Sequence, residues 1–332
     1  MEEAYMKDYL EIHNKALVID GHTDIPFDLL CTRNLEVNKF KGDEGADTLR
    51  VKHFPMLNQG NVNIVFANMF AEIVPEGSLR QVLLQLEDLI EQLEKSEGKL
   101  ICTKSDLEEV IAQKKIGMVL SLEGLEPLGK DLILLPLFYR LGVRSAMLTW
   151  NRRNYFASGC ADTGGLSTLG KQAIREMERL GMIIDVSHLN EEGFWDIMDI
   201  AVKPVIASHS NARALYNHPR NLTDDQIKAI VDTGGVIGLN SMFTADHDRH
   251  SLATCLEHLE YMINFAGNDH VGLGLDFNGY LPYSVYPGTP GLEEAGKIPS
   301  ITKELVQRGY DETTIKKILG ENFLRILNNV LP

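Results

Sequence analysis

The chain has 332 residues, of which 44% are hydrophobic, and this is enough to bury a core of ordinary size. Its formal net charge of -15 gives a surface that repels nucleic acid and anionic lipid, so neither is expected as a partner. No apolar run is long enough to span a bilayer, and the N-terminus lacks a signal core. The four cysteines are scattered and form no CxxC pair, which favours reduced thiols in a cytoplasmic protein.

Short apolar runs rich in β-branched residues recur along the chain. We expect eight strands, at residues 16–20, 63–67, 118–122, 144–149, 182–186, 205–207, 236–239 and 271–275. The runs are nearly continuous rather than alternating, which is typical of a parallel sheet that is covered on both faces.

Amphipathic segments of helical length separate these runs. Helices are expected at 79–93, 168–180, 191–201, 224–232, 252–265, 301–308 and 313–330, and another is expected to begin near Ser105 and Asp106. The eight β-then-α units predict a single domain over residues 1–332, an α/β fold of the (β/α)8 TIM-barrel type. Its last helices, from about 299 to 330, are expected to pack on the barrel. The alternative, a doubly wound sheet, lacks a GxGxxG loop after an early strand.

Residue types that bind metals follow the predicted strands at the edge where a barrel places its active site. His22 and Asp24 are two residues apart at the first strand, so both side chains share one face. The remaining candidates follow the third, fifth, sixth and eighth strands, and they are Glu123, His188, His209, Asp276 and Asn278. Each one alone could be a helix cap or a solvated side chain, but together they predict a cluster. Nitrogen and oxygen ligands without cysteine favour two metal ions with positions left for water.

Other polar residues are weaker candidates. Asp185 precedes His188 and is expected either to support a ligand or to be buried and locally satisfied. No serine lies in a GxSxG motif, which argues against a serine nucleophile. The remaining histidines are expected to be structural or exposed, and three arginines could hold a substrate carboxylate, namely Arg152, Arg153 and Arg220. A loop over 277–299, after the eighth strand, is expected to be functional.

These residues lie in segments that resemble the renal or membrane dipeptidase family of zinc metallopeptidases. The segments are DGHTDIP (20–26), SLEG (121–124), DVSH (185–188), ASHSNARAL (207–215), GLDFNG (274–279) and the C-terminal RGYDETTIKKILGENFLRIL (308–327). They follow the family's order and cover nearly the whole chain from residue 20 onward. The resemblance implies a metal-dependent hydrolase barrel with two zinc ions, a dipeptide substrate and a homodimer.

The resemblance also implies a role for each residue. His22 and Asp24 would bind one zinc ion, His188 and His209 the other, and Glu123 would bridge the two. Asp276 matches the acidic residue that contacts the bridging water and acts as the base. Substrate contacts are expected from Arg220, which matches the arginine that holds the C-terminal carboxylate, from Asn278 and from Trp150.

One position departs from the family pattern. The family commonly has a histidine after the fourth strand, in a segment like LTHN, where it contacts the scissile carbonyl. Here the segment is LTWN, and Trp150 offers one N–H donor and no charge. We therefore expect oxyanion stabilisation there to be weaker or rearranged, with either reduced dipeptidase activity or a different substrate. The resemblance as a whole implies a zinc dipeptidase, including activity on dipeptides with a C-terminal D-residue. The alternatives are hydrolysis of another amide, cyclic amide or lactone, and a catalytically inactive barrel that serves as a binding protein.

Overall fold

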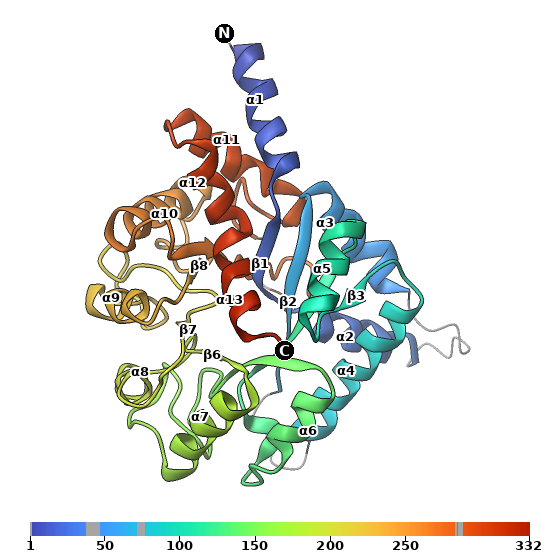
Figure 1. The fold of residues 1–332 in the computed structure, drawn as a ribbon, viewed down its shortest axis with the longest axis vertical. Helices are drawn as coiled ribbons and strands as arrows, with labels where there is room; N and C mark the ends of the chain where they lie inside the picture. The colour runs from blue at the N-terminus through green and yellow to red at the C-terminus, as the bar shows by residue number, and fades with distance from the viewer. Residues whose placement is uncertain (1, 38–46, 72–76, 283, 285–287) are drawn as a thin grey trace.

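The computed structural model describes residues 2–37, 47–71, 77–282, 284 and 288–332. Within these residues, eight parallel strands are paired in the order β7-β6-β5-β4-β2-β1-β9-β8. A bridge between Ala207 and Ile237 joins the two edges of this sheet. The sheet is therefore a nearly closed barrel surrounded by helices (Figure 1), which confirms the predicted TIM-type fold.

All eight predicted strands are present. They are β1 (Val18–Thr23), β2 (Val62–Met69), β4 (Gly117–Glu123), β5 (Val143–Met147), β6 (Ile183–Asp185), β7 (Val205–Ile206), β8 (Ile237–Leu239) and β9 (Val271–Leu273). A further strand, β3 (Lys99–Leu100), pairs with β4 outside the ring and is too short to leave a sequence pattern. Because all pairings are parallel, the carboxyl ends of the eight strands meet at one mouth of the barrel.

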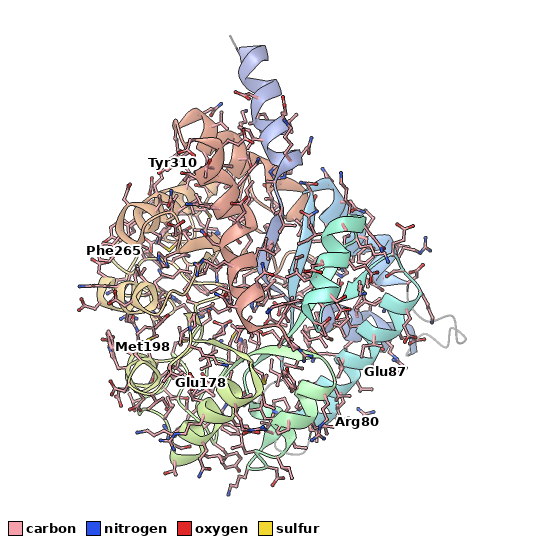
Figure 2. All side chains as sticks on the ribbon, viewed as in Figure 1. Arg80, Glu87, Glu178, Met198, Phe265 and Tyr310 are labelled. Carbon is pink, nitrogen blue, oxygen red and sulfur yellow. The ribbon has the colours of Figure 1, made fainter. Side chains whose placement is uncertain are left out.

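Helices surround the strands, except that the first helix projects from the barrel and the last lies across one of its ends (Figure 1). They are α1 (Glu2–Lys15), α2 (Ile25–Val37), α3 (Phe54–Gln59), α4 (Ser78–Glu94), α5 (Lys104–Gln113), α6 (Leu134–Arg140), α7 (Thr168–Leu180), α8 (Glu191–Met198), α9 (Asp224–Asp232), α10 (Leu252–Ala266), α11 (Pro299–Gln307), α12 (Glu312–Lys316) and α13 (Asn322–Val330). On α4, Val82, Leu86 and Leu89 are buried at three- and four-residue spacing, while Arg80 and Glu87 point outward (Figure 2). In the described part of the chain, no helix combines the length and apolarity needed to cross a bilayer.

Two predicted helix boundaries are wrong. The helix at 191–201 ends at Met198, because Pro204 disfavours helix before it and the N–H groups of Val202 and Lys203 donate to the Glu178 carboxylate. The helix expected to begin near Ser105 does begin there, at Lys104, where the Thr103 side chain caps it.

The second wrong boundary concerns the segment 313–330, which is not one regular helix. A π-helical turn at Lys317–Glu321 separates α12 from α13. Gly320 lies in this turn, and a Cβ atom there would come within 2.3 Å of the Leu17 backbone oxygen. The close approach of this turn to the start of β1 therefore requires glycine.

The interior of the barrel is filled by apolar side chains from the strands and from α13. Ile19, Ile64, Phe66, Val119, Ile183, Ile206 and Val236 form one buried cluster with Phe323, Ile326 and Leu327. A second cluster fills the space between the strands and the outer helices. Figure 1 shows α13 lying in front of the strands, so the last helix closes the end of the barrel opposite the mouth. The mouth is left for polar groups.

Candidate active site

The six predicted metal ligands come together at the mouth of the barrel. His22 lies within β1 and Glu123 ends β4, while the other four follow their strands by a few residues. Their ligand atoms form three buried groups, each lying within 4.8 Å: His22 with Asp24 and Glu123, Glu123 with His188 and His209, and His22 with His209 and Asp276. The structure therefore brings the six predicted side chains together, and they come from the ends of five strands.

Glu123 is the member that both halves of the cluster share. Its Oε1 atom lies 3.7 Å from His22 Nε2 and 2.8 Å from His188 Nε2. His188 Nε2 lies in turn 2.9 Å from His209 Nε2. On the other side, His22 Nε2 lies 3.7 Å from an oxygen of Asp24 and 3.7 Å from Asp276 Oδ1. A carboxylate between two such groups has the position of a bridging ligand.

The electrostatics of the cluster favour a cation. Burial acts to lower the pKa of His22, but the carboxylates of Glu123, Asp276 and Asp24 raise it to about 10. Burial raises the pKa of Glu123 well above its ordinary value and that of Asp276 to about 6. Burial also lowers the pKa of His188 and His209, so both imidazoles are neutral at physiological pH and are suited to bind a metal.

The backbone at two site residues is left-handed. His188 has a φ of 68° and Asp276 a φ of 55°, values that are uncommon for residues other than glycine. Phe243, which lines the same site, has a φ of 56°. Such conformations are retained where the surrounding structure imposes them, and here they turn the side chains into the mouth.

Neighbouring polar groups orient the ligands. The ring nitrogen Nδ1 of His188 lies 2.8 Å from Asn151 Oδ1, and Nδ1 of His209 lies 2.8 Å from Ser208 Oγ. In each case the contact leaves Nε2 facing the cluster. The amide of Asn240 donates to Asp276 Oδ2 at 3.1 Å. None of these supporting residues has a pattern in the sequence that marks it.

Two buried aspartates fasten the loops that carry the ligands. Asp20 Oδ1 accepts from the N–H of His22 at 3.3 Å and from the N–H of Leu275 at 2.8 Å, and thereby links the ends of β1 and β9. Asp185 Oδ1 accepts from the N–H groups of Ser187 and Ser208, each at 3.0 Å. Asp185 thus supports the segments of both His188 and His209, as one of its two predicted roles requires.

A second polar network lies behind Asp24. The Tyr280 hydroxyl accepts from the N–H of Asp24 at 3.0 Å, and the Tyr280 carbonyl accepts from Lys52 Nζ at 2.7 Å. The Asp28 carboxylate lies 2.7 Å from Lys52 Nζ and 2.8 Å from His53 Nε2. His53 is buried in this network, so it is structural as expected, and the network ties the loop after β9 to the first ligand pair.

A cavity of about 350 Å³, which we call the inner cavity, opens above the ligands. The predicted substrate-binding residues Arg220, Trp150 and Asn278 all line it. Arg220 is buried, its terminal nitrogen donates to the His209 carbonyl at 3.3 Å, and its Nε has no partner. Asn278 donates to Asp276 Oδ1 at 3.2 Å. Part of the predicted loop 277–299, at residues 283 and 285–287, lies outside the described residues.

The residues present fit a divalent metal centre. The donor atoms are imidazole nitrogens and carboxylate oxygens, which are the usual ligands of zinc outside thiolate sites. Asp24 Oδ1 is buried and has no hydrogen-bond partner, which would be costly unless another ligand satisfied it. With closed parallel strands, buried ligands and an open cavity above them, the molecule has the architecture of a barrel hydrolase.

Comparison with known proteins identifies the particular family. The family model for membrane dipeptidase, peptidase family M19, matches residues 6–331. A protein of Klebsiella pneumoniae described as an uncharacterized protein in the pqqA 5′ region is 39% identical over 277 residues, which cover 77% of this chain and 98% of that protein.

Solved structures agree with this match. The crystal structure of the metallopeptidase dipeptidase AC has a TM-score of 0.83 and 28% identity, over 95% of this chain and 99% of that one. A metallopeptidase from Rhodobacter sphaeroides, bound to a phosphinate mimic of the dipeptide L-Ala-D-Ala, has a TM-score of 0.81 and 26% identity over the same shares. The chain belongs to the membrane dipeptidase family, M19, and is a metallo-dipeptidase.

Proposed function

We propose that this metallo-dipeptidase uses two zinc ions, bound by His22 and Asp24 on one side and by His188 and His209 on the other, with Glu123 between them. The observation that carries this proposal is the shared position of Glu123 in two ligand groups. One ion could not contact all six side chains with the tetrahedral geometry that zinc prefers. When bound, the ions would lower the pKa of a water molecule towards neutrality and polarise the scissile carbonyl.

The chain's own residues supply the remaining steps. Arg220 holds the substrate's C-terminal carboxylate through its guanidinium, which is buried beside the ligands. Asp276 takes a proton from the attacking water and gives it to the leaving amine, and its pKa of about 6 suits this exchange near neutral pH. Asn240 and Asn278 donate to the two oxygens of Asp276 and fix its orientation.

The substrate class is a dipeptide with a free C-terminal carboxylate, including one with a D-residue at that position. The Rhodobacter sphaeroides relative binds a mimic of L-Ala-D-Ala, which supports the D-residue. Trp150 favours a second candidate, hydrolysis of another amide, cyclic amide or lactone, because an indole N–H is a weaker oxyanion donor than a charged imidazole. Cytoplasmic location and a homodimer stay predictions.

Elemental analysis combined with a substrate panel tests this function. Protein purified without chelators should carry two equivalents of zinc and should hydrolyse Leu-Ala, Ala-Ala and L-Ala-D-Ala. Chelation should abolish turnover and added zinc should restore it, while far-UV circular dichroism stays unchanged. Preference for an N-acyl amino acid or a lactone over every dipeptide would contradict the proposed substrate, and one equivalent of metal at full activity would contradict the binuclear site.

A further inference from the structure

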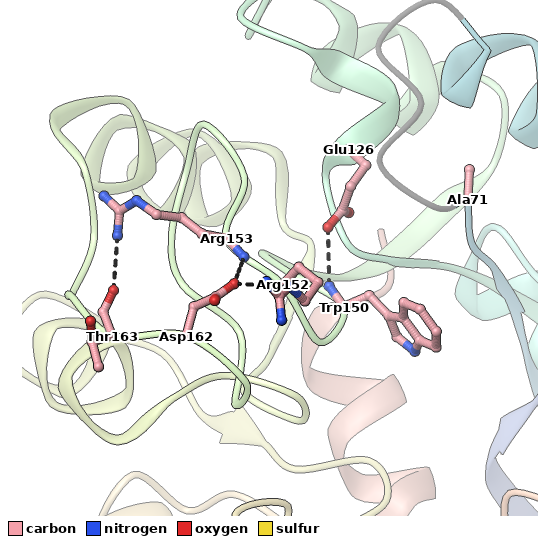
Figure 3. A pocket seen from close by; sticks show the side chains of 7 residues that line it. All are labelled: Ala71, Glu126, Trp150, Arg152, Arg153, Asp162 and Thr163. Atoms are coloured by element: carbon pink, nitrogen blue, oxygen red, sulfur yellow. Dashed lines mark hydrogen bonds and ion pairs between the residues drawn. The ribbon is translucent and has the colours of Figure 1, made fainter.

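A second cavity lies beside the inner cavity at the barrel mouth. This outer cavity has a volume of about 700 Å³ and is lined by Ala71, Glu126, Trp150, Arg152, Arg153, Asp162 and Thr163 (Figure 3). Among the described residues that line the two cavities, Trp150 alone belongs to both. In Figure 3, its indole extends away from the side chains of Arg153 and Asp162. Trp150 therefore stands between the two spaces.

Contacts on both sides hold Trp150 in this position. Its ring lies 5.3 Å from the ring of Phe70, which in turn lies 4.6 Å from the ring of Phe27. Its backbone N–H donates to Glu126 Oε1 at 3.2 Å, and Glu126 is buried in the loop after β4. Phe27, Phe70 and Trp150 thus form a continuous aromatic wall on one side of the inner cavity.

The order of the strands places this wall opposite Arg220. Arg220 follows β7 and Phe70 follows β2, and these two strands are four places apart in either direction around the ring. A dipeptide whose carboxylate is held by Arg220 therefore has its N-terminal residue directed toward Phe70 and Trp150. The metal ligands Glu123 and His188 line the same cavity as these residues.

The outer cavity adjoins the inner cavity at Trp150. Its lining comes from the loops that follow β2, β4 and β5, and Arg220 is not among the described residues that line it. Among its charged groups, Asp162 lies 3.4 Å from Arg152 Nε and accepts from the backbone N–H of Arg153 at 2.6 Å, while the Arg153 guanidinium donates to the Thr163 carbonyl at 3.4 Å. The inner cavity alone is at the small end of the range for ligand sites, whereas the two together would hold a longer peptide.

We propose that Trp150 is the residue that limits this enzyme to dipeptides. Its indole closes the N-terminal side of the inner cavity and separates it from the outer cavity. The N-terminal side chain of a dipeptide packs against the aromatic wall, and a further residue on that side meets the indole. This inference rests on the proposed dipeptidase function, and it assigns to Trp150 a role in substrate length rather than in oxyanion binding.

A matched pair of peptides tests the inference. Leu-Ala and Gly-Leu-Ala have the same scissile bond and the same C-terminal residue, and they differ only by one N-terminal glycine. For the wild-type enzyme, kcat/KM for the tripeptide should be at least a hundredfold below that for the dipeptide. In Trp150→Ala, the ratio of tripeptide to dipeptide kcat/KM should rise at least tenfold, whatever happens to the absolute rates. Trp150→Phe, which keeps a smaller aromatic ring, should raise the ratio less.

Trp195, the other tryptophan of the chain, provides the control because it lies on the outer helix α8 and is 38% exposed. Trp195→Ala should leave the ratio unchanged. An unchanged ratio in a folded, metal-loaded Trp150→Ala enzyme, or efficient tripeptide cleavage by the wild type, overturns the proposal. If the wild type cleaves no dipeptide at all, the proposed function fails instead. The role of Trp150 in substrate length is then tested by calorimetry. The affinity for Gly-Leu-Ala relative to Leu-Ala should rise in Trp150→Ala as expected for the kcat/KM ratio.

Discussion

The two ends of the barrel differ in the kind of side chain that fills them. At the closed end, Phe323, Ile326 and Leu327 of α13 pack among apolar strand residues, and the buried Asn322 amide donates to the carbonyls of Asn268 and Val271. At the mouth, six buried polar ligands converge, and buried atoms such as Asp24 Oδ1 have no partner in the protein. The closed end therefore contributes stability, while the mouth forgoes stability for binding and catalysis.

Asp276→Asn is expected to have the largest effect at the mouth. Loss of the proton acceptor should lower kcat about 10²- to 10⁴-fold, because positioned acid–base groups contribute factors of that size. The thermal midpoint should change little, since asparagine has nearly the same shape. Stopped assays on Leu-Ala and zinc analysis measure both quantities. The exposed Asp131 provides the control as Asp131→Asn, and wild-type kinetics in Asp276→Asn would exclude it as the base.

Phe323→Ala should show the opposite behaviour at the closed end. Removing this fully buried ring leaves a cavity among the strands and should lower the free energy of unfolding by about 3–5 kcal/mol. The kcat of the folded fraction should stay near the wild-type value, because the ring lies beside the strand backbone at Gly21 and Gly272 and does not line the cavity above the ligands. Urea unfolding followed by circular dichroism measures the loss. Asn329→Ala, on the exposed face of α13, should change it by less than about 0.5 kcal/mol.

Burying Glu126 at the mouth should make the free energy of unfolding depend on pH. Burial raises its pKa from 4.5 to about 7, so the folded state holds a proton that the unfolded state releases between these values. Below pH 4.5 the group is protonated in both states and costs nothing. As pH rises to 7, stability should fall by up to about 3 kcal/mol.

Glu126→Gln removes that titration but keeps an oxygen that can accept from the Trp150 N–H. The difference in unfolding free energy between Glu126→Gln and the wild type should therefore grow in favour of the variant from pH 4.5 to 7 and then level off. Chemical unfolding across this range measures the difference. A difference that is independent of pH would show that Glu126 has an ordinary pKa.

The smallest expected effect comes from Asn151, which orients the metal ligand His188. Asn151→Ala removes the contact to His188 Nδ1 and should weaken metal affinity or activity about 10- to 100-fold. Asn151→Asp, which keeps the acceptor oxygen, should recover most of the loss. Competition with a chelator measures the affinity. Equal losses in both variants would indicate that the side-chain volume matters, and not the hydrogen bond.

The strands of the barrel and the positions of the ligands could be predicted from the sequence. The apolar runs identify the strands of the barrel, and His22, Glu123 and His209 stand out because each is a polar residue at the end of such a run. The helices α1, α2, α3 and α6 were not expected; α1 mixes charges of both signs, and α3 and α6 are short. Packing supports such segments, as where His13 of α1 contacts Thr302 of α11.

The finer structure of the site could not be predicted. Asn151 and Asn240 make their contacts across distances in sequence that only the closed barrel brings together. The left-handed backbone at His188 and Asp276 leaves no mark in the residue type. The position of Trp150 between two cavities likewise depends on Phe70 and Glu126, which precede it by many residues. Local sequence patterns predict which residues are metal ligands, while contacts between residues far apart in the sequence determine how those ligands are oriented.

The place of α13 has a consequence for how the enzyme acquires its metal in the cell. The ligands of β1 are among the first residues that a ribosome releases, but their neighbours from β9 and the interior ring of Phe323 are among the last. During synthesis, His22 and Asp24 therefore wait for about 250 further residues before they meet Asp276. The two ligand groups that share Glu123 are complete once His209 has emerged, so they could hold metal before the rest of the barrel forms. Asp276 and α13 arrive last, and the enzyme therefore stays inactive until its final strand and helix have folded.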